Sequence, residues 1–208
     1  MSDSLIDQLS QSFKRFPGIG PRQAKRFVYY LLRAPKSDLD NLLNQIRDLK
    51  SSINQCQACF RYFPKTYPLT SNPSLCTICS NEKRDPSILM LVEKDIDLEN
   101  IERSGTYKGH YFVLGGLVPI LDKNPEQSFR SRELISLIKS KENLQEIIIA
   151  LSANTEGDHT VEFLKQFLIS SLSPKTYRLS TLGRGLSTGA ELEYSDSETL
   201  KNALKHRE

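Results

Sequence analysis

The 208-residue sequence has no apolar run near the roughly 18 residues that a membrane-spanning helix needs. Its first residues, MSDSLIDQLSQSF, lack the basic start and apolar core of a secretory signal peptide. Internal repeats and low-complexity tracts are also absent. These absences predict a cytoplasmic protein without a membrane partner. Its four cysteines are then expected in a reducing compartment, where disulfides rarely persist.

The chain also has little net charge of either sign. A formal charge of +3 and a pI near 8.6 permit nucleic acid as a partner without requiring it. With 38% hydrophobic and 25% charged residues, the composition is typical of a folded protein with a packed core. The length allows one mid-sized domain or two or three small ones.

Apolar residues recur every three or four positions in the amino-terminal quarter, which predicts helices. One helix is expected across Leu5–Phe16 and a second across Ala24–Leu32. A third is expected from Ser37, a good N-cap residue, and Pro35 separates it from the second.

From Ile88 onward, apolar strand-like runs alternate with helical patterns. Strands are expected at 88–92, 111–114, 146–151 and 176–180, and helices at 98–104, 131–141 and 159–172. This alternation predicts a mostly parallel sheet with helices on its faces, followed by a Gly-rich loop and a short tail helix.

The four cysteines form two pairs, CQAC at 56–59 and CTIC at 76–79, with 16 residues between them. The spacing is that of structural zinc sites, in which four thiolates surround one ion and leave no open position for water. We therefore predict that Cys56, Cys59, Cys76 and Cys79 bind one structural Zn²⁺. The alternatives are a rubredoxin-like iron centre, a redox-active C-x-x-C pair and four thiols without a metal.

The stretch FPGIGPRQAKR, residues 16–26, has the pattern of a helix-hairpin-helix. Two glycines permit a tight turn, and Pro21 suits the first position of the next helix. Residues 14–36 hold seven Lys or Arg and no carboxylate. Free N–H groups and the positive helix end favour an anion there, which predicts DNA phosphate contacts. The residues expected to make them are Gly18, Gly20, Arg22, Lys25 and Arg26. The alternative is a helical hairpin with a solvated basic face.

Acidic residues follow two of the expected strands. Glu93 ends one strand, with Asp95 and Asp97 just beyond, and Glu156 and Asp158 follow another. Ligands usually bind at the carboxyl ends of parallel strands. This arrangement resembles the Toprim domain of topoisomerases and primases, in which the Glu acts as acid or base and an Asp pair holds magnesium. Simple capping of the next helix is the alternative explanation of these acids.

Two other features carry weaker signals. The histidines, His110, His159 and His206, are scattered, which favours ordinary structural roles. The loop Gly183–Gly189 is rich in glycine but lacks the G-K-[ST] ending of a phosphate-binding P-loop. We expect it to be a plain turn before an edge strand.

The order of these parts resembles the bacterial RecR family of recombination proteins over essentially the full chain. The motifs that carry the resemblance are PGIGPRQAKR at 17–26, the four cysteines, residues 92–116, TEGD at 155–158 and residues 183–196. The resemblance implies an α+β multidomain fold. Its expected parts are a helix-hairpin-helix DNA-binding region at 1–52, a four-cysteine zinc module at 53–80, a Toprim-like α/β domain at 81–176 and a tail at 177–208.

The resemblance further implies a non-enzymatic DNA clamp that works with RecO and RecF to load RecA at single-stranded gaps. It implies binding to single-stranded and duplex DNA without sequence specificity, and assembly into homodimers or ring-like homotetramers. Arg22 and Arg26 match basic hairpin residues of the family. Its Toprim acids, linked to RecO contact and to magnesium, are matched by Glu93, Asp97, Glu156 and Asp158. The alternative function is a magnesium-dependent nuclease or primase-like enzyme of the Toprim type.

The chain departs from the family pattern in two places. Segment 60–75, between the cysteine pairs, is longer than the family usually has. Asp95 stands where many members have proline, which adds a negative charge beside Glu93.

Overall fold

A computed structural model describes residues 4–65, 72–172, 177–186, 189 and 191–205. Contacts within the chain divide it into two compact units, Met1–Ile53 and Asn54–Glu208. The domain boundaries expected from the sequence are finer than this division and stay predictions. In the described ranges, no helix is both long enough and apolar enough to cross a bilayer.

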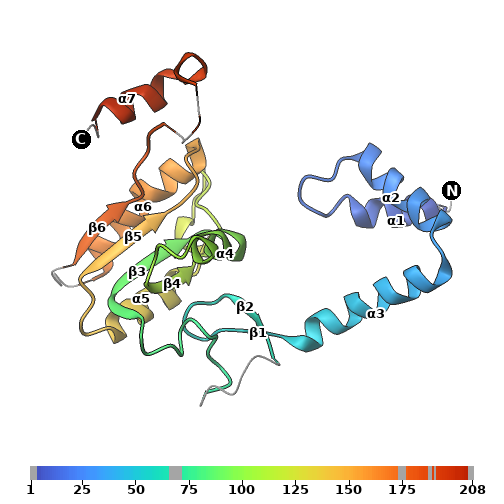
Figure 1. The fold of residues 1–208 in the computed structure, drawn as a ribbon, viewed down its shortest axis with the longest axis horizontal. Coiled ribbons are helices and arrows are strands. Elements are labelled where there is room, and N and C mark those ends of the chain that lie inside the picture. Colours follow the sequence, from blue (N-terminus) through green and yellow to red (C-terminus); the bar gives the residue numbers. More distant parts are fainter. Residues whose placement is uncertain (1–3, 66–71, 173–176, 187–188, 190, 206–208) are drawn as a thin grey trace. The chain divides into compact units, whose positions relative to one another are not determined.

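The amino-terminal unit consists of three helices (Figure 1): α1 (Leu5–Phe13), α2 (Pro21–Arg33) and α3 (Lys36–Ser52). Helix α1 packs on α2 through an edge-to-face contact of Phe13 and Phe27, whose ring centroids lie 5.7 Å apart. The three expected helices are therefore confirmed. The expected cap at Ser37 is wrong, because Pro35 occupies the N-cap position and Ser37 lies inside the first turn.

The second unit is built on a parallel four-stranded sheet in the order β4-β3-β5-β6 (Figure 1). Its elements are β3 (Asp85–Val92), α4 (Asp95–Ser104), β4 (Gly109–Val113), the 3₁₀ turn η1 (Pro125–Gln127), α5 (Ser131–Ser140), β5 (Glu146–Ala150), α6 (Thr155–Ser171) and β6 (Arg178–Thr181). The predicted parallel sheet, and with it the α+β fold class, is confirmed.

Alternation along the strands divides the buried side chains between two cores. On one face, Leu89, Leu91 and Phe112 pack with apolar residues of α5 and α6. On the other face, Met90 and Val113 pack with Leu98 of α4 and with the cysteines. Helices α5 and α6 therefore share one face, and α4 shares the other with the cysteine module.

The cysteine module also contains two short paired strands that the sequence did not predict, β1 (Ile53–Gln55) and β2 (Tyr62–Pro64). Three-residue strands are too short to produce a recognisable alternation. Residues 66–71 of the long segment 60–75 lie outside the described residues.

Two helices begin earlier than the apolar pattern predicts. Helix α4 begins at Asp95 and not at residue 98, and α6 begins at Thr155 and not at residue 159. In both cases the added first turn is acidic, which suits the positive end of a helix but adds no apolar periodicity.

The C-terminal segment contains a 3₁₀ turn, η2 (Leu192–Tyr194), and the expected tail helix, α7 (Ser197–Lys205). The position expected for the Gly183–Gly189 loop is wrong. It follows β6, which is itself the edge strand, and no later strand occurs in the part of the chain that the structure describes. Ser187 and Thr188 of this loop lie outside the described residues.

Candidate nucleic-acid interface, metal centre and acidic edge

The hairpin turn presents backbone amides at the start of α2. Gly18 has a φ of +76°, which glycine adopts without the steric cost of a Cβ. Gly20 is the N-cap of α2 and Pro21 occupies the first turn, as the sequence predicts. No side chain caps this helix start, and its first turn contains no acidic residue. The positive end of the helix is therefore open to an anion.

Three cations lie in the first two turns of α2. Arg22, Lys25 and Arg26 are all exposed on α2. The guanidinium of Arg26 donates a long hydrogen bond of 3.4 Å to the side-chain oxygen of Gln23. Within residues 4–53, no carboxylate forms an ion pair with any of the three. Arg22, Lys25 and Arg26 are therefore accessible in the first two turns of α2, after the uncapped helix start.

The four cysteine sulfurs lie within 4.8 Å of one another, and three of the cysteines are buried. The sulfurs of Cys59 and Cys76 are 3.6 Å apart. Four sulfurs at about 2.3 Å from a zinc ion would form a tetrahedron with edges of about 3.8 Å. The four side chains therefore fit one tetrahedral metal ion.

Backbone hydrogen bonds shape both halves of this cluster in the same way. The amide of Phe60 donates to the carbonyl of Cys56, and the amide of Ser80 donates to that of Cys76. The amide of Cys76 also donates to the sulfur of Cys56 over 3.4 Å. Each C-x2-C pair is thus folded back so that both its sulfurs face one point.

The thiols affect each other's protonation strongly. Hydrogen bonds with the other three thiols lower the pKa of Cys56, whereas hydrogen bonds with the other three raise the pKa of Cys79. A bound cation would replace the thiol protons, because thiolates and not thiols are metal ligands.

The cysteine module is attached to the β4 edge of the sheet. The carbonyl of Cys59 accepts a hydrogen bond from the amide of Val113, at 2.9 Å, where β4 ends. The next residue, Phe60, has a φ of +62°, the one positive φ at a described residue other than glycine. Its ring packs edge-to-face on Phe112 at 5.4 Å and lies under the guanidinium of Arg130 at the same separation.

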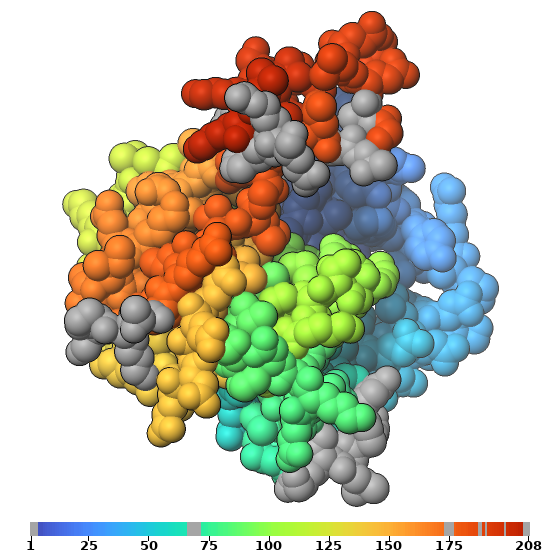
Figure 2. Space-filling view, turned by 60° about the vertical axis from the view of Figure 1, so that its left-hand side comes forward, coloured from blue at the N-terminus to red at the C-terminus, as the bar shows by residue number. Residues whose placement is uncertain are grey.

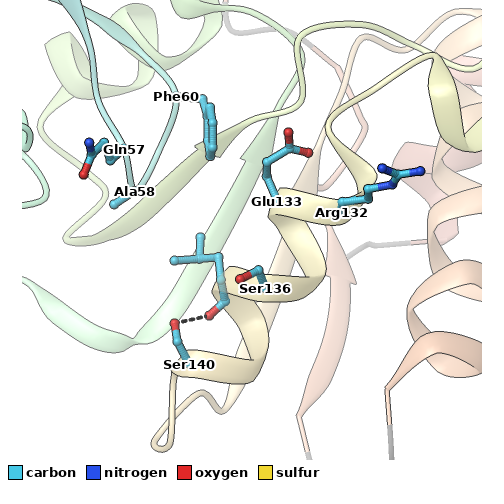
Figure 3. A pocket seen from close by; sticks show the side chains of 8 residues that line it. Gln57, Ala58, Phe60, Arg132, Glu133, Ser136 and Ser140 are labelled. Carbon is cyan, nitrogen blue, oxygen red and sulfur yellow. Dashed lines mark hydrogen bonds between the residues drawn. The ribbon is translucent and has the colours of Figure 1, made fainter.

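A groove of about 460 Å³ lies between this module and α5 (Figure 3). Its lining residues are Gln57, Ala58, Phe60, Arg132, Glu133, Ser136, Leu137 and Ser140. Helix α5 contributes two hydroxyl side chains and the apolar Leu137 here, and the hydroxyl of Ser140 donates to the carbonyl of Leu137. Arg132 and Glu133 carry opposite charges, so the groove favours neither an anionic nor a cationic ligand.

The predicted acids lie at the carboxyl ends of β3 and β5. Glu93 is 8% exposed, and its carboxylate pairs with the ammonium of Lys94 at 2.5 Å. The hydrogen bond with Glu93 raises the pKa of Lys94, and the nearby carboxylates of Asp97 and Glu156 raise it further. Lys94 is therefore an internal counter-ion for three of the four predicted acids, a role that the sequence analysis missed. We call Glu93, Asp97, Glu156 and Asp158 the acidic edge.

Two of the aspartates after β3 stabilise local structure. The carboxylate of Asp97 accepts a hydrogen bond from the amide of Lys94, at 3.0 Å, and so caps the start of α4. Asp95 accepts a hydrogen bond from the amide of Tyr62, at 2.7 Å. The carboxylate of Asp95 thus connects α4 to strand β2 of the cysteine module.

The two acids after β5 lie in the first turn of α6, whose N-cap is Asn154. Glu156 is exposed. Asp158 forms an ion pair with Arg184 of the Gly-rich loop, and hydrogen bonds from that guanidinium lower the pKa of Asp158. Among the described residues, the cysteines alone form a group of three or more side chains placed to hold a metal ion. The acidic edge thus has partners within the protein, including Arg184, which the sequence analysis did not single out.

Comparison with known proteins covers both units of this chain. The family model for the RecR helix-hairpin-helix matches residues 6–50, a Toprim domain model matches residues 87–180, and the RecR C-terminal model matches residues 185–208. A protein of Herpetosiphon aurantiacus named recombination protein RecR is 38% identical over 203 residues, which cover 97% of this chain and 93% of the relative. The chain belongs to the RecR family. The resemblance drawn from the sequence motifs is confirmed.

Other RecR relatives are similar in sequence to this chain over nearly the same span. The recombination protein RecR of Chloroflexus aggregans is 37% identical over 202 residues, covering 97% of this chain and 92% of its own. That of Dehalococcoides mccartyi strain 195 is 34% identical over 203 residues, covering 98% and 93%. The cysteine module lies between the helix-hairpin-helix and Toprim matches, and the Asp158–Arg184 pair links the Toprim match to the start of the C-terminal segment.

Proposed function

We propose that this RecR-family protein is a non-enzymatic DNA clamp and mediator of recombinational repair. It binds single-stranded and duplex DNA without sequence specificity, and it works with RecO and RecF to promote RecA loading at single-stranded gaps. The observation that supports this proposal most directly is the start of α2, which has no side-chain cap, no acidic residue in its first turn and several exposed cations. Family membership supports the repair role, since the relatives are named recombination proteins.

The hairpin suits the sugar–phosphate backbone and not the edges of bases. Gly18 and Gly20 have open space where a Cβ would lie, so a phosphate can approach the backbone amides closely. Arg22, Lys25 and Arg26 then neutralise that phosphate and its neighbours on the same strand. Contacts of this type position DNA without reading its sequence. Assembly into a homodimer or a ring-like homotetramer would add the contacts of several hairpins and retain DNA even if each bound weakly.

The cysteine cluster is assigned one structural Zn²⁺ in this proposal. Cys56, Cys59, Cys76 and Cys79 supply four sulfur ligands, the set that structural zinc prefers. All four ligand positions are filled by protein, so the ion supplies rigidity and no open site for a reacting water. Its function is to hold together a module that has few apolar residues of its own.

The acidic edge is proposed as the docking surface for a basic partner, with RecO as the partner that the family implies. Glu93, Asp97 and Glu156 share one internal cation, Lys94, so together they keep a net negative charge. A basic protein surface would be attracted by that charge.

The first test measures DNA affinity of the Arg22→Ala/Arg26→Ala variant by fluorescence anisotropy over a salt series. We expect affinity for a single-stranded oligonucleotide to fall roughly a hundredfold, since hydrogen bonds to charged groups contribute about 1.5 kcal/mol each and two are lost. The slope of log affinity against log salt should also decrease by about 1 for each lost phosphate contact.

The matched control is Arg47→Ala/Lys50→Ala, which removes two exposed cations from α3 of the same unit. This variant should keep the affinity and the salt slope of the wild type within a factor of about 3. Equal losses in both double variants would contradict a specific role for the hairpin.

A second test asks whether the acidic edge catalyses a reaction. We expect neither cleavage of DNA nor primer synthesis when magnesium is titrated into the wild-type protein, because Glu93 and Asp158 are already engaged in ion pairs with Lys94 and Arg184. Glu93→Gln should weaken binding of RecO and leave DNA affinity unchanged. Magnesium-dependent turnover that Glu93→Gln abolishes would favour the Toprim enzyme instead.

A further inference from the structure

The end of β4 is held between a metal ligand and the acidic edge. The amide of Val113 donates to the carbonyl of Cys59, and two residues later the amide of Gly115 donates to the carbonyl of Glu93, at 2.9 Å. Between them, the amide of Leu114 donates to the carbonyl of Val92, at 2.8 Å. Three successive backbone hydrogen bonds thus connect Cys59 to Glu93.

Arg130 reinforces this path at its centre. Its guanidinium donates to the carbonyl of Val113, at 2.7 Å, and its amide donates to the carbonyl of Leu114, at 3.0 Å. Gly115, with a φ of +85°, lies directly against this guanidinium, and a Cβ there would come within 2.6 Å of Nη1. The positions of Arg130 and of the β4 end are therefore mutually dependent.

Phe60 joins the cysteine module to Arg130 across the edge of the sheet. The cysteines pack on the α4 face, whereas the Phe60 ring reaches the core on the α5 face, where it contacts Phe112. A positive φ is costly for a bulky residue and persists only where surrounding contacts compensate for it. The contacts with Phe112 and Arg130 supply that compensation.

A second connection reaches the same edge from its other side. The amide of Tyr62, three residues after Cys59, donates to Asp95, two residues after Glu93. The cysteine module and α4 also lie next to each other on the surface (Figure 2). The Glu93–Asp95 segment is therefore linked to the cysteine module directly at Asp95 and, through the end of β4, at Glu93.

We propose that metal binding at the cysteine cluster is energetically coupled to the ordering of the acidic edge, with Phe60, Asp95 and Arg130 as positioning residues. Coupling of this kind is reciprocal, so a variant that breaks the path lowers both the order of the edge and the affinity for the metal. The inference concerns the edge that the proposed function assigns to partner docking. Its test uses neither DNA nor a partner, so the two proposals fail separately.

The test combines hydrogen exchange at Leu114 and Gly115 with Zn²⁺ affinity, measured by competition with a chromophoric chelator, on the full-length chain. Phe60→Gly is the decisive variant, because glycine adopts a positive φ without steric cost and the substitution also removes the aromatic ring. We expect exchange about tenfold faster and Zn²⁺ affinity about tenfold lower. If the cysteine module acted independently of the sheet, glycine would leave Zn²⁺ affinity unchanged or raise it, and that result would overturn the proposal.

Asp95 provides the second arm of the test. Asp95→Ala should likewise make exchange at Leu114 and Gly115 faster and lower the Zn²⁺ affinity. Asp95→Asn, which keeps an acceptor oxygen for the Tyr62 amide, should restore both to wild-type values. Gln57→Ala is the matched control, because Gln57 is exposed in the same CQAC turn and its side chain is outside the path. Amides of β6 should exchange at wild-type rates in every variant. Asp95→Asn behaving like Asp95→Ala, or β6 exchanging as fast as Gly115, would contradict the coupling.

Discussion

At the scale of single residues, several charges in this protein are balanced by a nearby charge of opposite sign. Lys94 follows Glu93 directly and also faces Asp97 and Glu156, so one ammonium moderates three carboxylates. Arg84 pairs in the same way with Glu102 of α4 and donates to the carbonyl of Gly109. The hairpin cations differ, since their stretch contains no carboxylate. That contrast is the residue-level reason for assigning the hairpin to DNA.

His110 on β4 makes a further residue-level prediction. Burial lowers the pKa of this histidine, and the positive charges of Lys141 and Arg84 lower it further. As pH falls, the unfolded chain therefore takes up a proton before the folded chain does. The free energy of unfolding should decrease as pH drops below about 6.5, and the decrease should level off below the folded-state pKa.

His110→Gln removes this proton uptake while keeping a side chain of similar size. Urea unfolding midpoints at pH 7.5 and pH 6.0 should differ less for the variant than for the wild type. Parallel decreases in both proteins would show that His110 does not contribute to the pH dependence.

At the scale of elements, apolar periodicity located the four strands of the parallel sheet and the helices that pack on it. It placed the starts of some helices wrongly. The first turns of α4 and α6 are acidic and carry no apolar pattern, so the sequence analysis placed Asp95, Asp97, Glu156 and Asp158 between the strand ends and the helices and not inside the helices. Helix capping was the alternative explanation for these acids, and it holds for Asp97, which accepts a hydrogen bond from the amide of Lys94 at the start of α4.

The hairpin was predictable because its determinants are local. A G-x-G turn followed by proline specifies the start of α2 within a few residues. Strands β1 and β2, in contrast, depend on contacts with residues distant in sequence, such as the bond from Tyr62 to Asp95. No local pattern could have shown that bond, or the position of Phe60 over the β4 edge.

At the scale of the whole molecule, the chain consists of a small helical unit and a larger unit that unites the cysteine module, the sheet and the tail. Cysteine spacing was enough to predict a metal cluster, because C-x2-C pairs act as compact chelating turns. Which cations neutralise the acidic edge was not predictable. Arg184 lies 26 residues after Asp158, and only the folded chain brings the two together.

The account depends most on where DNA binds, and hydrogen exchange of the full-length protein with and without a single-stranded oligonucleotide measures this directly. We predict slower exchange for the amides of residues 18–26, with residues 91–97 and 155–158 unchanged. Slower exchange at the acidic edge, with the hairpin amides unchanged, would contradict the account.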